Sequence, residues 1–351
     1  MVKVKVDGYF FLRIIAKTVA FILVSCAGPV DENAPDYSEL ESVWQYLKVY
    51  SIYQERIPED PFAFKAPEDI LWAVADTLYG TDIYHRYTRY AGSPSVVTTT
   101  TADNVAVAAA GDDALVFLEA ATADSTVVIR IESFEAELTY NQFIALLPQV
   151  QKYPNIVIDL RPNGGGEIDE ATSIIDAFLA VDKAYIQARE REYLEQERTA
   201  GTLEWHPWVT EETARPELRD KQITIMMRDS TASASEILIA ALKDCAGATL
   251  VGSRSYGKGI GQIRLVRRDR RTLQITFLQL KGLDGGSIGE YHHKGIAPDV
   301  QVSGTDDQWL LAAIKVHEPS ATAASIRKLK KTMPGTAALF EPAGYRVVYE
   351  K

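Results

Sequence analysis

The sequence predicts an α/β fold in which a mixed sheet is flanked by helices. Apolar, strand-like segments alternate with helix-patterned segments over the middle of the 351-residue chain. Residues 155–160 form a nearly continuous apolar run, typical of a parallel strand covered on both faces, and helical spacing follows at 169–179. Hydrophobic residues make up 46% of the chain and charged residues 24%, which suits a folded protein with a large core. This alternation indicates strand–helix–strand units.

The N-terminus differs from the rest of the chain. Basic residues precede an apolar run at 18–24, and the tetrapeptide Leu-Val-Ser-Cys at 23–26 resembles a bacterial lipobox. The pattern predicts a signal peptide over 1–25 and a lipidated cysteine at Cys26, followed by a polar tether over 26–37. An ordinary signal peptide and a short membrane anchor are the alternatives, although the apolar run is shorter than the about 20 residues that span a bilayer.

Residues 38–90 are predicted to form an N-terminal helical region. A capping-box pattern at 38–41 introduces the first helix. A proline at the first position and a glycine just beyond the end suit a second helix over 67–78. Residues 91–120 are predicted to be a linker with short strands.

The core is predicted to span 121–316, with a C-terminal extension over 317–351 that contains a basic helix at 325–332. Within the core, a charged insertion at 189–220 holds two tryptophans. Either it forms a lid or rim over a site, or its aromatic residues pack on the sheet. The expected core strands lie at 127–134, 155–160, 184–187, 223–227, 248–251, 263–267 and 272–280. Helices are expected after a cap at Thr139, over 169–179 and after the stretch 230–236, where apolar residues from Ile237 to Cys245 recur at helical spacing.

A hydroxyl-rich stretch at 230–236 lies between a predicted strand and a predicted helix. Ser233 therefore occupies a strand-to-helix turn, where unpaired backbone N–H groups carry the positive end of the helix dipole. The amide of Ala234 is placed to stabilise a developing oxyanion. Such a turn is also typical of an ordinary helix N-cap, so composition alone leaves Ser230 and Ser235 open as alternatives.

Lys258 lies between two glycines, and Gln262 follows four residues later. A free lysine ammonium has a pKa of about 10.4 and cannot act as a base at neutral pH. Burial disfavours the charged form and can lower this pKa by several units. The neutral amide of Gln262 can accept from the amine without favouring its charged form. A serine nucleophile with a lysine base needs this combination of residues.

These stretches resemble the C-terminal processing peptidases, also called tail-specific proteases, a Ser/Lys family of serine peptidases. The similar segments are Thr-Ala-Ser-Ala-Ser-Glu at 231–236, Tyr-Gly-Lys-Gly-Ile-Gly-Gln at 256–262, Asp-Leu-Arg-Pro-Asn-Gly-Gly-Gly at 159–166 and Gly-Ile-Ala-Pro-Asp-Val at 295–300. The resemblance implies a ClpP/crotonase-like core. Many members carry a PDZ domain before this core, but the interval 91–120 is too short for one, so a member without a PDZ domain is expected.

The resemblance also assigns roles to individual residues. It implies that Ser233 is the nucleophile, that Lys258 is its general base and that Gln262 orients the lysine. It further implies two oxyanion donors, Ala234 and one glycine, either Gly164 or Gly165. The implied function is that of a serine endopeptidase that cleaves exported proteins or peptides.

Two other functions are compatible with the sequence. The same fold can serve as a non-catalytic binder of apolar peptides or lipids, although a binder has no need of the full set of Ser233, Lys258 and Gln262. Residues 252–259 also match the P-loop pattern except at the last position, where glycine replaces Ser/Thr. A P-loop opens a helix, whereas β-like residues follow here, which disfavours nucleotide binding.

Charge and cysteine content restrict the partners. The formal net charge is −11, so there is no electrostatic basis for binding nucleic acid or an anionic membrane surface. Cys245 is expected to be a buried small hydrophobe. No cysteine or histidine spacing indicates zinc, and no cofactor is predicted. Membrane contact is expected only through the lipid on Cys26, which would place an exported protein in the periplasm or at the cell surface. The sequence makes no prediction of oligomeric state.

Overall fold

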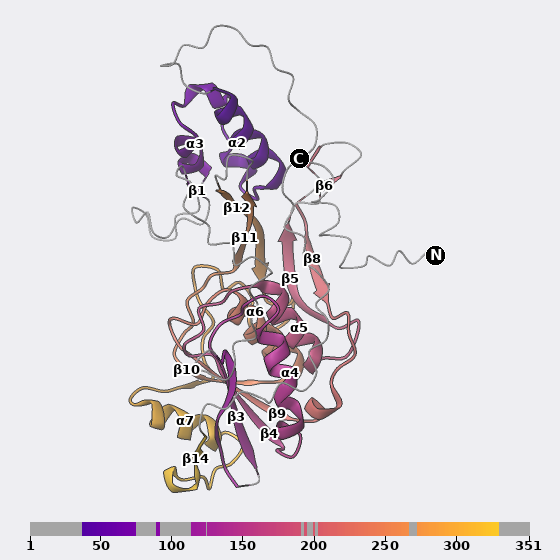
Figure 1. Ribbon diagram of the computed structural model, residues 1–351, viewed down its shortest axis with the longest axis vertical. Coiled ribbons are helices and arrows are strands. Elements are labelled where there is room, and N and C mark those ends of the chain that lie inside the picture. The colour runs from indigo at the N-terminus through magenta and orange to yellow at the C-terminus, as the bar shows by residue number, and fades with distance from the viewer. Residues whose placement is uncertain are drawn as a thin grey trace, which may run out of the picture.

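A computed structural model describes residues 37–74, 89–91, 114–123, 125–190, 193–194, 199–200, 203–266 and 272–329. The predicted signal peptide, Cys26, nearly all of the tether and the end of the C-terminal extension lie outside these residues. The described chain is elongated, with two helices at one end and a helix-covered sheet at the other (Figure 1).

A mixed seven-stranded sheet forms the centre of the larger part. Its order is β13-β10-β9-β4-β3-β2-β14. The pairs from β13 through β3 are parallel, whereas β2 and β14 are antiparallel to their neighbours. The predicted α/β fold with a mixed sheet is therefore confirmed. The strands are β2 Val116–Ala121, β3 Thr126–Ile131, β4 Asn155–Asp159, β9 Gln222–Met227, β10 Thr249–Gly252, β13 Val300–Gln301 and β14 Arg327–Lys328.

Helices cover both faces of this sheet, as Figure 1 shows. Side chains alternate across a strand. In β4, Ile156 and Ile158 therefore pack in the cluster formed with α4 Thr139–Val150, α5 Ile168–Phe178 and α6 Ala234–Ala246. Val157 points the other way, into the cluster that includes α7 Asp306–Lys315. All five residues of β4 are buried, as the apolar run predicted.

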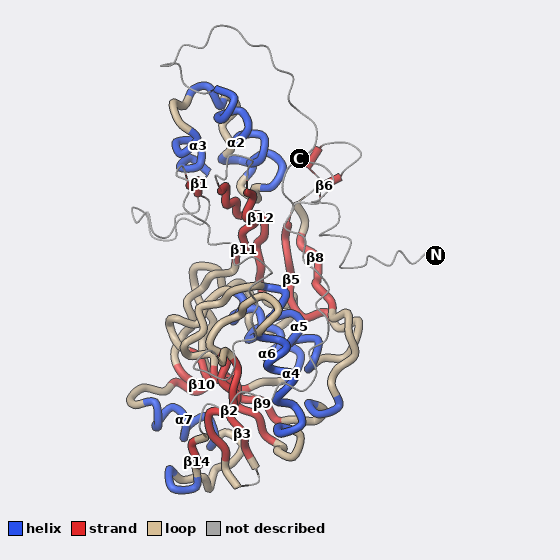
Figure 2. The backbone as a smooth tube through the Cα atoms, in the orientation of Figure 1, coloured by secondary structure: helices blue, strands red, loops and turns tan. Residues whose placement is uncertain are grey.

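A second, antiparallel sheet rises from this core toward the N-terminal helices (Figure 2). Its long strand β12 carries Leu273 and Ile275 into an apolar cluster with α2 Tyr37–Tyr50 and α3 Pro67–Val74. The other strands are β1 Arg89–Ala91, β5 Ala184–Glu190, β8 Trp205–Val209 and β11 Ile260–Val266, with β12 spanning Thr272–Lys281. The remaining elements are the short pair β6 Tyr193–Leu194 with β7 Thr199–Ala200, and the 3-10 turns Gln54–Arg56, Pro61–Ala63, Pro216–Leu218 and Ala323–Ser325.

The insertion at 189–220 contributes a strand to this second sheet. Strand β8 pairs antiparallel with β5. Trp208 is half-buried against the core, and its Nε1 donates to Glu190 at 3.3 Å. Trp205 lies beneath the Lys281 ammonium, 4.8 Å from the ring centroid. Of the two interpretations of the insertion, the structure favours aromatic residues that pack on the sheet.

The structure differs from the prediction in two places, the secondary structure near residue 325 and the limits of the core sheet. The basic helix expected at 325–332 is wrong for the described residues, because the chain there forms the 3-10 turn Ala323–Ser325 and then β14. The open edge of β2 explains the difference, since its unpaired backbone groups accept Arg327 and Lys328 as a strand. With β2 and β14 included, the sheet extends beyond 121–316 at both ends. Only residues 92–115 separate β1 from β2, too few for a PDZ domain at this position.

A charge cluster lies where β4 ends. Arg161 donates from Nε and Nη2 to the two oxygens of the fully buried Asp159, at 2.9 and 2.8 Å. Glu119 occupies a bulge in β2, and its carboxylate lies 3.7 Å from Arg161 and 3.4 Å from Arg130. Burial, followed by the charge of Asp159, raises the pKa of Glu119 to about 7, although both arginines act in the opposite direction.

We expect Glu119 to make the stability of the fold depend on pH. Its folded pKa of about 7 lies above the ordinary value of 4.5, so the native state holds a proton that the unfolded state releases. The contribution is full below about pH 4.5 and is lost as the pH rises through 7. In thermal melts, Glu119→Gln should reduce the difference in Tm between pH 5 and pH 7.5. The control variant Glu132→Gln, which removes another carboxylate beside Arg130, should leave that difference in Tm unchanged. If Tm depended on pH equally in Glu119→Gln and wild type, the raised pKa of Glu119 would be contradicted.

Candidate active site

The site is built where three neighbouring parallel strands end. Strands β4, β9 and β10 lie side by side, and their carboxyl ends lead to the glycine turn at 164–166, the serine turn at 230–236 and the lysine loop at 255–259. Because parallel strands end at the same edge of a sheet, segments far apart in sequence meet there. The topology thus assembles the stretches that the sequence analysis singled out.

Most hydroxyls of the serine turn hold it against the segment that follows β4. Ser230, Thr231 and Ser235 donate to carbonyl oxygens within 160–163, at 3.0, 2.8 and 3.1 Å. The Ser233 hydroxyl donates to no carbonyl in the described part of the chain. These contacts separate Ser233 from the neighbouring hydroxyls that composition alone left open.

The backbone of Ser233 is strained. Its φ of 58° and ψ of −121° are uncommon for any residue other than glycine. Such a conformation costs about 1–3 kcal/mol and persists only where the surroundings enforce it, often at functional sites. Ser233 is half-buried at the start of α6, directly before the Ala234 amide. The turn thus presents a hydroxyl beside the positive end of the helix dipole.

The glycine turn lies directly against Ser233. A Cβ placed on Gly165, whose φ is +105°, would lie 2.7 Å from the Ser233 Cβ and 2.8 Å from the Ala232 carbonyl oxygen. The Gly165 amide donates to Asn163 Oδ1 at 2.9 Å. The Gly164 amide has no acceptor among the described residues, and Gly164 is exposed. Both candidate oxyanion donors therefore belong to the turn that contacts the serine, and Gly165 packs closer to it.

The carboxylate of Glu236 joins the serine turn to the lysine loop. Its Oε2 accepts from the backbone amides of Ser233, at 3.0 Å, and Lys258, at 2.7 Å. The two amide nitrogens are therefore no further apart than the sum of these distances. Its Oε1 accepts from the Gly257 amide at 2.7 Å and the Ser255 hydroxyl at 2.6 Å. The structure thus brings the segments of Ser233 and Lys258 together.

Glu236 is completely buried. Burial raises its pKa above the ordinary value, whereas its four hydrogen bonds act to lower it. The Ser255 hydroxyl that donates to it also accepts from the Ile296 amide at 2.7 Å. The sequence analysis noted Glu236 only as part of a motif. Its spacing of three residues from Ser233 is a capping-box pattern, and this signal could have identified it.

Gln262 lies in β11 at a bulge. The register between β11 and β12 shifts between Gly261 and Gln262, and such shifts re-aim side chains. Its buried Nε2 has no hydrogen-bond partner among the described residues. Gln262 therefore has an unused donor in the strand that continues the lysine loop.

A second residue that sequence reasoning missed adjoins the lysine. His292 Nδ1 accepts from the Gly259 amide at 3.2 Å, which places the proton of a neutral ring on Nε2. The ring of the fully buried Tyr291 packs against Gly259. No spacing in the sequence links these residues to the lysine loop.

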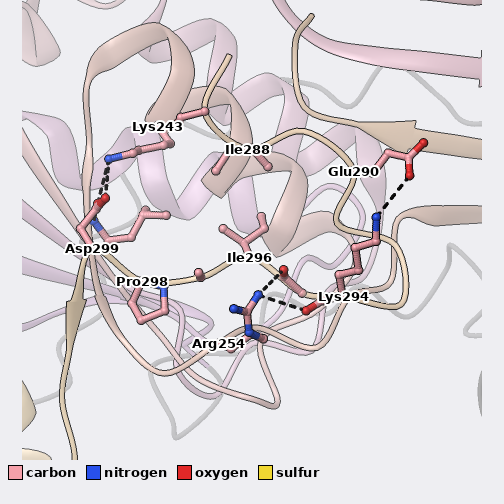
Figure 3. A pocket seen from close by; sticks show the side chains of 12 residues that line it. Lys243, Arg254, Ile288, Glu290, Lys294, Ile296, Pro298 and Asp299 are labelled. Carbon is pink, nitrogen blue, oxygen red and sulfur yellow. Dashed lines mark hydrogen bonds and ion pairs between the residues drawn. The ribbon is translucent and has the colours of Figure 1, made fainter. Parts of the chain in front are cut away.

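Two open clefts lie near the start of the lysine loop, and Arg254 lines both. One, of about 360 Å³, has an apolar floor that includes Ile288, Ile296 and Pro298 (Figure 3). The other, of about 370 Å³, is lined in part by Ser255 and Tyr256. Lys294 also lines both clefts. Ser233 and Lys258 line neither cleft. In the described part of the chain, no group of three or more His, Cys, Asp or Glu residues is arranged to hold a metal ion.

Comparison with known proteins identifies the family. The family model described as peptidase family S41 matches residues 125–302, which include the glycine turn, the serine turn and the lysine loop. The chain belongs to peptidase family S41. The predicted resemblance to tail-specific proteases is confirmed at this level.

Curated relatives of this S41 chain match part of it. A probable CtpA-like serine protease of Staphylococcus haemolyticus (strain JCSC1435) is 31% identical over 149 residues, which is 42% of this chain and 27% of the relative. A protein of the same description from Staphylococcus aureus (strain COL) is 34% identical over 147 residues, with the same coverage. The match thus spans about a quarter of the length of these relatives.

Solved structures share the fold over most of the S41 chain. A putative S41 protease from Bacteroides fragilis NCTC 9343 has a TM-score of 0.50 at 14% identity, covering 86% of this chain and all of that one. A lipoprotein from Streptococcus agalactiae has a TM-score of 0.52 at 12% identity with the same coverage. At 12% and 14% sequence identity, these similarities show a shared fold and nothing about activity.

We expect Gly165→Ala to destabilise the protein, because the new Cβ would collide with Ser233 and the backbone would be held at a positive φ. Strain of this kind costs about 1–2 kcal/mol before the clash is added. Gly285→Ala is a matched control, since Gly285 has a φ of +80° and open space around its Cβ position. Denaturant unfolding should show a larger loss of stability for Gly165→Ala. Equal losses in the two variants would show that Gly165 does not pack against Ser233 as described.

Proposed function

We propose that this S41 chain is a serine endopeptidase with a Ser/Lys dyad. One observation carries the proposal: a single buried carboxylate oxygen accepts from the amides of both Ser233 and Lys258. The strained turn at Ser233 supports it, because strained backbone clusters at functional sites. The probable CtpA-like serine proteases among its relatives support it as well.

In the proposed reaction, the neutral amine of Lys258 takes the proton of the Ser233 hydroxyl as that oxygen attacks the scissile carbonyl carbon. Gln262 accepts from the amine and orients it. The Ala234 amide and one amide of the pair Gly164 and Gly165 stabilise the oxyanion of the tetrahedral intermediate. Lys258 then protonates the departing amine, which leaves an ester on the serine. Water activated by the same lysine hydrolyses that ester.

We further propose that the substrates are exported proteins or peptides and that the protein is held at a bacterial membrane by a lipid on Cys26. The lipobox-like tetrapeptide at 23–26 and the basic, apolar leader support this placement. None of the described helices has the length and apolar character needed to cross a bilayer. Labelling of cells with a fatty-acid probe, followed by comparison of wild type with Cys26→Ala, tests the anchor.

Ser233→Ala should reduce cleavage of a denatured protein substrate by at least about 10³-fold, because the nucleophile is removed. It should also abolish covalent labelling by a fluorophosphonate probe. Ser325→Ala removes a hydroxyl that bonds only within its own turn and should leave both readouts unchanged. Cleavage retained by Ser233→Ala would eliminate the assignment. Absence of labelling in the wild type, together with retained peptide binding, would support the non-catalytic binder instead.

Lys258→Ala should lower kcat by about 10²–10⁴-fold, the usual contribution of a general base. Lys258→Arg should be as inactive, because arginine keeps its proton throughout the accessible pH range. In the wild type, kcat/KM should fall toward acid pH as Lys258 takes up a proton. Lys315→Arg, a change on an exposed residue of α7, should leave the profile unchanged.

Gln262→Glu should move the acid limb of that profile to higher pH, because a carboxylate beside the amine favours its charged form. An unmoved limb in Gln262→Glu would contradict the assignment of Gln262. An active Lys258→Arg variant would contradict the assignment of Lys258.

A further inference from the structure

The hydrogen bonds of Glu236 exceed what a helix cap requires. Of the two bonds in a capping box, only one involves the glutamate side chain, which accepts from the amide of the N-cap residue; here the Ser233 amide donates it at 3.0 Å. The other three donors, Ser255 Oγ and the amides of Gly257 and Lys258, come from the loop that follows β10, at 2.6 to 2.7 Å. Capping of α6 explains none of these three contacts.

The three hydrogen bonds that Glu236 accepts from the lysine loop are shorter than the one it accepts from the Ser233 amide, and all four donor groups are uncharged. Burying a carboxylate is costly unless hydrogen bonds replace its hydration, and a carboxylate that accepts two or three backbone N–H bonds is stabilised in its charged form. A glutamate at this position is therefore satisfied only while the serine turn and the lysine loop are both in place.

We propose that Glu236 is a positioning residue that fixes the lysine loop on the serine turn, and that Ser255 is its partner in this task. The inference rests on the proposed function. Ser255 donates to Glu236 Oε1 and accepts from the Ile296 amide at 2.7 Å, so it ties the carboxylate to the 295–299 segment. The pair sets the distance between the nucleophile turn and the base without touching the substrate.

Glu236→Gln tests the inference in the full-length protein. A glutamine has the same shape but offers one acceptor oxygen and turns an NH₂ group toward two of the donors. The serine turn and the lysine loop can no longer be held at once. We expect kcat to fall by about 10²-fold, the scale of a 1 Å misplacement of a catalytic group, with a parallel fall in the rate of fluorophosphonate labelling. KM should change by less than about threefold, since the interaction lies outside substrate binding.

Glu170→Gln is the matched control. Glu170 also accepts from two backbone amides, those of Glu137 and Tyr140, both at 2.6 Å, but these donors belong to neither the serine turn nor the lysine loop. This variant should keep the wild-type kcat and labelling rate. A Glu236→Gln variant with both rates within about threefold of wild type would overturn the inference.

The Ser255 variants keep the inference testable if Glu236→Gln does not fold. Ser255→Ala removes one donor, and we expect about a tenfold loss of kcat, whereas Ser255→Thr keeps the hydroxyl and should restore it. A wild-type kcat in Ser255→Ala would overturn the inference. A different result tests the proposed function itself. Activity retained by Ser233→Ala would contradict the Ser/Lys proposal. A wild type that is active and labelled, together with an unaffected Glu236→Gln variant, would contradict only the role of Glu236.

Discussion

The carboxylate of Glu236 is the contact on which the geometry of the site depends. It lies in the first turn of α6, it is completely buried, and its oxygens are shared between two segments. Each carboxylate oxygen can accept two hydrogen bonds, so this one side chain is fully occupied by donors from the serine turn and the lysine loop. Loss of either segment would leave the buried carboxylate with fewer hydrogen bonds, at a cost that couples the order of one segment to the order of the other.

Sheet topology explains why a single glutamate can reach both segments. The chain leaves β9 at Met227, passes through the serine turn, descends along α6 and returns through β10, which pairs with β9 in parallel. Parallel neighbours end at the same edge, so the loop after Gly252 arrives beside the turn before Ala234. Strand β4 adds the glycine turn on the other side of β9. Three short loops and one sheet edge therefore define the site, and the second sheet joins it through β11, which starts two residues after Lys258.

The core strands β3, β4, β9 and β10, the helices α4, α5 and α6 and the three loops could be predicted from the sequence, because each has a local signature. The run at 155–160 is apolar where both faces of the sheet are covered, and the glycines at 164–166 mark a turn. The contacts among these elements could not be predicted. Nothing local relates His292 to Gly259, which are 33 residues apart. The two-residue strand β14 escaped prediction for the same reason, since it depends on the open edge of β2 rather than on its own composition.

The backbone of Ser233 supports the proposed catalytic role of the turn over a purely structural one. A glycine would adopt a φ of 58° without strain, so the shape of the turn is no reason for a serine. Helix capping is no better reason, because the Glu236 carboxylate already satisfies the Ser233 amide and a glycine N-cap costs only a few tenths of a kcal/mol. The neighbouring hydroxyls of Ser230, Thr231 and Ser235 hold the turn in place. The Ser233 hydroxyl lies next to a helix N-terminus and the lysine loop, which supports the proposal that Ser233 is the nucleophile.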